Sequence, residues 1–140
     1  MNRFLGTVAV IAGVAGIAAS ASLVSAHHST TMFEHSKTMT IKGKVVELRW
    51  VNPHVSLTVK GLVGDGKDQE EWVMEMTSPG NLVRAGGWSR NIVKTGDDIT
   101  VDFSPLRDAT LRGGALKKIT TVDGKAYTAN IRAQEMPGLE

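Results

Sequence analysis

Histidine is the residue type best suited to metal chemistry in this sequence, which contains four histidines and no cysteine. Two of them, His27 and His28, are adjacent. If the chain is cut after Ala26, the free amine of His27 and its own Nδ1 can chelate one metal ion. One further imidazole would then complete the T-shaped nitrogen set of a copper histidine brace. In a second mode, the metal ion is bound in one plane by the amine, a deprotonated backbone amide and the His28 imidazole. Tetragonal all-nitrogen ligand sets favour Cu(II) over the other common divalent ions.

The further imidazole has two candidate sources. His54 follows a predicted turn at Asn52 and Pro53 and lies on the outward face of a predicted strand, and His35 is the other candidate. Plainer interpretations remain open. An exported histidine pair can be a solvated leader that binds metal weakly, and His54 can simply form a hydrogen bond with its turn. The sequence therefore predicts a candidate copper site at His27, His28 and His54.

The copper hypothesis depends on the first 26 residues being removed. Arg3 gives the start a positive charge, residues 4–24 are apolar or small, and Val24, Ser25 and Ala26 end the segment with small residues. This pattern predicts a cleavable signal peptide and a periplasmic location. An uncleaved anchor is the alternative, because about 20 apolar residues can span a bilayer. We expect contact with a membrane only through this segment before cleavage.

Charge and composition narrow the classes of partner. The chain has 16 basic and 14 acidic residues, and Arg3 is the only charge before His27, so the remainder is nearly neutral. Its basic residues alternate with acidic ones and form no stripe, which argues against nucleic acid as a partner. Without cysteine, disulfides and Cys-based zinc sites are excluded. The expected partner is a metal ion or a small ligand, and the sequence does not indicate a protein partner.

A metal-free barrel that binds a ligand or a protein is the second hypothesis. It would use residues around the predicted turn, or arginines near the predicted helix and the long loop after it, and its candidate residues are Trp50, Asn52, Arg84, Arg90 and Arg107. Scattered surface arginines are the plainer interpretation. The sequence has no recognisable Ser-His-Asp set, no His-Glu-x-x-His motif and no phosphate-binding glycine loop. We therefore predict a binding protein rather than an enzyme, and a copper enzyme is the third possibility.

The elements that must position these residues are mostly strands. Alternating apolar residues predict strands over 38–50, 55–60, 71–76, 99–103, 115–122 and 125–131. The alternation changes phase within the first strand, which predicts a bulge. Ser78 and Pro79 predict a short helix that ends at Gly86 and Gly87. Three strands, a helix and two or three further strands is the order of an OB fold. A β-sandwich would need more strands.

The predicted organisation is all-β with one short helix, a small OB-like Greek-key β-barrel. An extended segment (27–37) precedes the barrel (38–131), and a loose tail (132–140) follows it. The residues expected in the barrel core are Val55, Leu57, Trp72, Val101 and Phe103.

Several motifs together resemble a family of bacterial periplasmic proteins that is catalogued only as a domain of unknown function. They lie in residues 27–29, 32–33, 37, 43–45, 50–55, 78–82, 84–90, 95–97 and 105–108. The resemblance covers essentially all of residues 27–131. It implies a fold and a location, and it brings no established activity.

Overall fold

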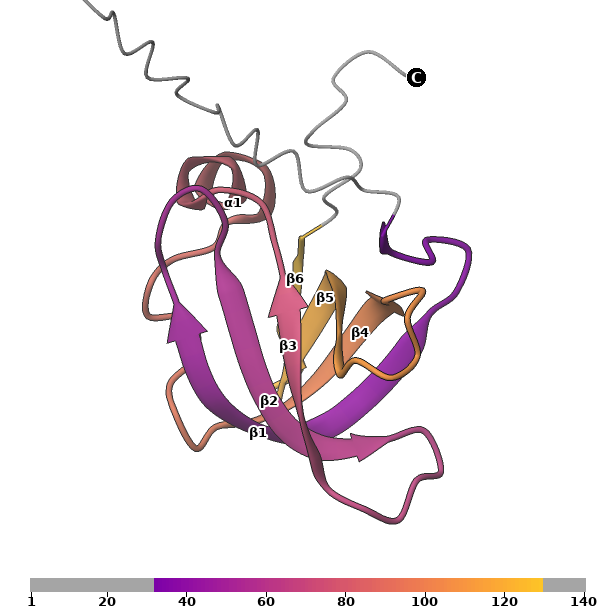
Figure 1. The fold of residues 1–140 in the computed structure, drawn as a ribbon. Helices are drawn as coiled ribbons and strands as arrows, with labels where there is room; N and C mark the ends of the chain where they lie inside the picture. The colour runs from indigo at the N-terminus through magenta and orange to yellow at the C-terminus, as the bar shows by residue number, and fades with distance from the viewer. Residues whose placement is uncertain (1–31, 130–140) are drawn as a thin grey trace, which may run out of the picture.

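The computed structural model describes residues 32–129, which form six strands and one helix (Figure 1). In chain order these elements are β1 (Met39–Arg49), β2 (Ser56–Val63), β3 (Glu70–Glu75), α1 (Pro79–Gly86), β4 (Asp98–Pro105), β5 (Gly113–Thr121) and β6 (Ala126–Thr128).

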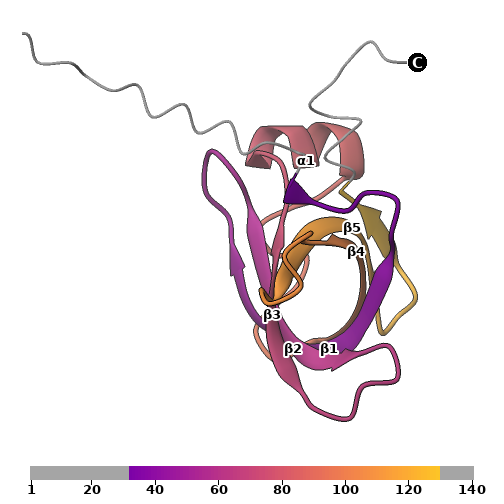
Figure 2. The ribbon, with the colours of Figure 1, turned by 45° about the vertical axis from the view of Figure 1, so that its right-hand side comes forward.

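The strands close into a barrel. β1 pairs antiparallel with both β2 and β4, β2 pairs with β3, and β4 pairs with β5. A parallel pairing between β3 and β5, in which Val73 lies opposite Gly113, completes the ring. Figure 2 shows the five strands as this ring, and β6 extends the sheet beyond β5. The OB-like barrel is confirmed, with its helix between the third and fourth strands.

β1 contributes to two strand pairs because it is long and contains a bulge. Its first half pairs with β4, whereas nearly its whole length pairs with β2. The register against β2 shifts between Val45 and Glu47, so Val46 is the extra residue of a bulge. The change of phase predicted for this strand is therefore confirmed.

Two glycines bring β1 and β2 unusually close together. Gly43 and Gly61 lie opposite each other in the register. A Cβ added to Gly43 would lie 2.2 Å from the Lys60 carbonyl oxygen, and one added to Gly61 would lie 2.3 Å from that of Lys42. A side chain at either position would therefore push the two strands apart.

The barrel core contains all five residues that the sequence predicted to be buried. Trp72 is 7% exposed and the other four are fully buried. The rings of Trp72 and Phe103 lie 5.4 Å apart in a tilted arrangement, which is a favourable geometry for two aromatic side chains. Met74 and Met76 are also fully buried, as expected for side chains that alternate along one face of a strand.

α1 begins and ends as its sequence predicts. The Ser78 hydroxyl accepts a hydrogen bond from the backbone N–H of Asn81, and Gly87 ends the helix with φ 63°, in the left-handed region. Leu82 is buried in the barrel core. Trp88, just after the helix, is 2% exposed and its Nε1 donates to the Thr128 carbonyl at 2.8 Å. The helix is thus held to the barrel on both sides of its C-terminal end.

Some element bounds differ from those predicted. β5 begins at Gly113, two residues early, because its parallel pairing with β3 begins there. β6 was predicted over 125–131, but it begins at Ala126 and ends at Thr128. The turn between β5 and β6 includes Gly124 at φ 81° and extends through Lys125, which shortens the strand at its start. Residue 131 lies outside the described residues.

Within residues 32–129, no helix has the length and apolarity needed to cross a membrane.

Candidate functional site

The loop between β1 and β2 carries the predicted ligand His54. The peptide bond between Asn52 and Pro53 in this loop is cis. The Nδ1 atom of His54 lies 2.5 Å from Oε1 of Glu75, and each side chain is 26% exposed. The strands create this contact, because β2 starts just after His54 and its Ser56 lies opposite Glu75 in the register with β3.

The contact with Glu75 orients the His54 ring. An ionised carboxylate can only accept hydrogen bonds, so it would pair with the tautomer that carries its proton on Nδ1. A histidine that binds a metal usually donates its other ring N–H to a carboxylate in this way, which fixes the tautomer and the ring orientation. The pair therefore has the arrangement of a metal-binding imidazole whose coordinating atom would be Nε2.

The other predicted ligands are placed as follows. His27 and His28 lie outside the described residues. His35 precedes β1, and its ring meets that of Phe33 edge-on at 6.0 Å. Among residues 32–129, no three His, Cys, Asp or Glu side chains gather closely enough to hold a metal ion. A metal bound at His54 would therefore need further ligands, either of another chemical type or from outside the described part of the chain.

The weaker ligand candidates are spread over several segments. Trp50 is partly buried against the core and Asn52 is exposed, both near His54. Arg84 lies on α1 and its Nη2 donates to the Asn81 side chain at 2.5 Å, and Arg90 is exposed in the turn after the helix. Arg107 lies in the loop between β4 and β5, where its Nη1 donates to Glu34 at 3.1 Å. The three arginines are thus positioned by three different segments.

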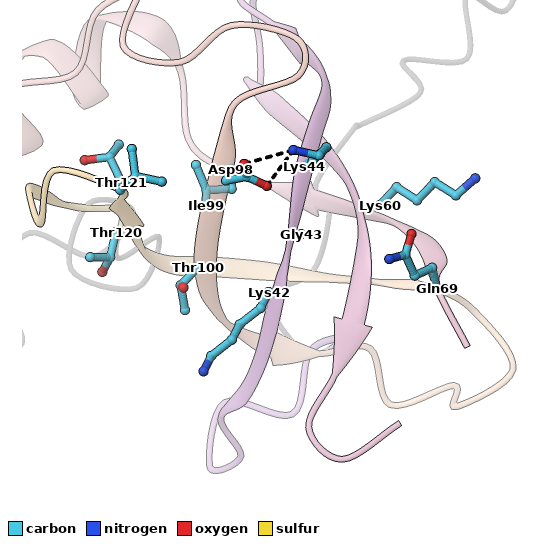
Figure 3. Close-up of a pocket in the computed structure, with 11 residues that line it drawn as sticks. Lys42, Gly43, Lys44, Lys60, Gln69, Asp98, Ile99, Thr100, Thr120 and Thr121 are labelled. Carbon is cyan, nitrogen blue, oxygen red and sulfur yellow. Dashed lines mark hydrogen bonds and ion pairs between the residues drawn. The ribbon is translucent and has the colours of Figure 1, made fainter. Parts of the chain in front are cut away.

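A groove on the outer face of the barrel was not predicted. It encloses about 460 Å³ over β1, β2, β4 and β5, and three lysines line it, Lys42, Lys44 and Lys60. Lys44 forms an ion pair with Asp98 at 2.8 Å. Lys42 and Lys60 extend away from each other in Figure 3, so these cations do not converge on one point. Strand alternation was the signal that would have revealed this row of outward lysines.

A second cavity lies at the end of the barrel where β1 begins and β4 ends. This mouth cavity has a volume of about 410 Å³. The segment before β1 and the loop between β4 and β5 form its walls, and Trp72 reaches it from the barrel interior. Its lining residues are Glu34, Lys37, Met39, Trp72, Pro105, Leu106, Arg107, Ala109 and Leu111.

The charges at the mouth cavity belong to one small cluster. The Ser36 hydroxyl donates to Glu34 at 2.6 Å and lowers the pKa of that carboxyl, against the opposing effect of burial. The positive charges of Arg107 and Lys37 lower the same pKa further. Glu34 is therefore ionised at neutral pH, and these two cations with one anion leave the cavity with a net positive charge.

The comparisons with known proteins cover most of the residues that form these sites. The model of a family described as "Family of unknown function (DUF6152)" matches residues 14–115. The chain belongs to this family. No curated protein and no solved structure matches the chain.

Membership of this family confirms the expected relation to an uncharacterised domain family. The matched residues include His27, His28, His54 and Glu75, and also Trp72 of the mouth cavity. The family description names no activity, so it neither supports nor excludes an enzymatic function for this chain. The function must therefore be argued from the residues themselves.

Proposed function

We propose that this protein is an exported, periplasmic β-barrel that binds one Cu(II) ion at the mature N-terminus. In this proposal His27 supplies its amine and its Nδ1, and the third nitrogen comes from His54 or from His28. The observation that carries the proposal is the contact between His54 and Glu75, because it orients an imidazole on the barrel in the way that metal sites orient theirs.

A histidine brace needs only one side chain from the folded barrel. Two of its three nitrogens belong to the same terminal residue, so a single well-held imidazole completes the set. This requirement is compatible with a described region that holds no group of three ligating side chains. Glu75 favours His54 for this role, since the carboxylate makes the ring a better electron donor and limits its rotation.

We expect the processed protein to bind one Cu(II) far more tightly than Zn(II). A Gly-Ser-Gly-Ser extension before His27 moves the amine away and breaks the first chelate ring while every side chain remains. A one- or two-residue extension is unsuitable, because a histidine third in the chain can chelate copper with the amine and two amides. The four-residue extension should weaken Cu(II) binding by more than about 100-fold, measured by competition titration with a chelator.

Variants of the barrel distinguish the complete site from a leader that binds copper by itself. If His54 supplies the third nitrogen, Glu75→Gln should weaken Cu(II) binding by about 10- to 100-fold, because it removes the carboxylate that orients His54. Glu71→Gln is the matched control, since Glu71 lies on the same strand and shares its outward parity. Equal Cu(II) affinity in the wild type, His54→Ala and Glu75→Gln would show that the barrel contributes no ligand.

We expect export to remove residues 1–26. Val24, Ser25 and Ala26 provide the small residues that a signal peptidase requires. The intact mass of the protein recovered from a periplasmic extract should correspond to a chain that starts at His27. A full-length chain in the membrane fraction would contradict this prediction and would remove the terminal amine from the proposed copper site.

The two alternative functions, a metal-free binding barrel and a copper enzyme, predict different results for protein purified from the periplasm. A metal-free binding barrel would purify from the periplasm without copper and would not take it up tightly. A copper enzyme would bind the metal and also produce peroxide when ascorbate and oxygen are supplied, whereas a copper-binding module would produce little.

A further inference from the structure

We propose that the mouth cavity is a second binding site, and that it takes a small carboxylic acid with an apolar body. This inference does not depend on copper, because His54 does not line the cavity. It rests on the size and lining of the cavity, on its net positive charge, and on one buried donor that has no acceptor.

The size and the lining suit a small amphipathic molecule. A volume of about 410 Å³ falls within the range of ligand sites, which are mostly apolar with a few polar groups. Six of the nine lining residues are apolar, and they are Met39, Trp72, Pro105, Leu106, Ala109 and Leu111. The apolar part of a ligand can pack against these side chains and so be removed from water.

The buried donor is the indole of Trp72. Its Nε1 is shielded from solvent and has no hydrogen-bond partner in the described structure. A buried N–H without a partner is unfavourable, so an acceptor that reaches it is bound favourably. The Arg112 guanidinium lies 5.5 Å from the centre of the same ring, and its Nε already donates to Glu70 at 2.9 Å.

The indole Nε1 has almost no surface open to solvent, so an acceptor reaches it only when neighbouring side chains move aside. The loop between β4 and β5 forms the outer wall of the cavity, and Leu111 within it is 52% exposed. Moving exposed side chains uncovers little additional apolar surface, so the rearrangement is inexpensive. A hydrogen bond gained by Trp72 would offset it.

The charges decide which acceptor fits. Arg107 forms an ion pair with Glu34, and Lys37 adds a further positive charge at the same cavity. An anionic acceptor therefore gains from this net charge and from the indole N–H together, whereas a cationic ligand would gain from neither. A carboxylate satisfies both features with a single group.

Decanoate is a suitable probe, with 1-decanol as its uncharged counterpart. Titration of decanoate into full mature protein should shift the indole N–H resonance of Trp72 in NMR spectra, assigned from Trp72→Phe. That variant keeps an aromatic ring but lacks the donor, and it should bind decanoate about tenfold more weakly. Lys37→Gln should weaken decanoate binding by about two- to fivefold and leave 1-decanol unaffected.

A charge placed on the cavity wall tests the location. Leu111→Asp should abolish decanoate binding, whereas Val122→Asp should not, because Val122 is 83% exposed and is not part of the cavity lining. His54→Ala should also leave decanoate binding unchanged, which separates this proposal from the copper site. An unshifted Trp72 resonance, or equal binding by Leu111→Asp and Val122→Asp, would overturn the proposal.

Discussion

Replacing Trp72 with alanine should lower the free energy of unfolding by about 3–5 kcal/mol, the range found for other large aromatic truncations. The side chain is 7% exposed and packs against Phe103, so alanine leaves a void beside that ring. Chemical denaturation followed by circular dichroism measures the change. A loss within about 0.5 kcal/mol of wild type would mean that Trp72 contributes to binding and little to the core.

Trp72→Phe is the matched control for this loss. Phenylalanine keeps an aromatic ring and removes an N–H that has no partner in the described structure. The smaller ring loses some packing, but the removal of an unpaired donor acts in the opposite direction. We expect a much smaller loss of stability than for alanine, which would show that the ring stabilises the barrel and the indole nitrogen does not.

Replacing Gly43 with alanine should destabilise the barrel by about 3 kcal/mol or more, at the upper end of the range for overpacked sites. The new Cβ would lie 2.2 Å from a carbonyl oxygen of β2 and 2.6 Å from the Cα of Gly61. Both contacts are with backbone, so no side-chain rotation can relieve them. Thermal unfolding should show a much lower midpoint or no folded protein.

Gly80→Ala is the control for this substitution. Gly80 lies in the first turn of α1, and the nearest atom to a Cβ there is a flexible Arg84 guanidinium nitrogen at 3.6 Å. Alanine in a helix is favoured over glycine by about 1 kcal/mol, so stability should be unchanged or slightly higher. If Gly43→Ala behaved like Gly80→Ala, the close approach of β1 and β2 would not be essential.

Local signals in the sequence were sufficient to predict the architecture. Ser78 and Pro79 at the start of α1, and the change of phase in β1, depend on neighbouring residues alone, and both predictions are confirmed. The burial of Trp72 followed equally from its place on an alternating strand. Such patterns show whether each side chain lies on the inner or the outer face of its strand, which is enough to define the strands and the core.

The sites depend on contacts between distant residues, which a pattern does not record. His54 could be singled out from its turn, but its pairing with Glu75 depends on the register between β2 and β3. The mouth cavity was not predicted because Arg107 and Glu34 are far apart in the sequence and come into contact only in the folded barrel. His27 and His28 lie outside the described residues, so their part in the site stays a prediction.

Closing the ring also protects the protein from self-association. In an open sheet, β3 would be an edge strand with unpaired backbone groups, and Val73 on its outer face is 49% exposed. The parallel pairing with β5 covers that edge for Val73, Met74 and Glu75. Exposed, unprotected strand edges are templates on which further chains add. A substitution that opened the seam between β3 and β5 would therefore create an aggregation-prone surface.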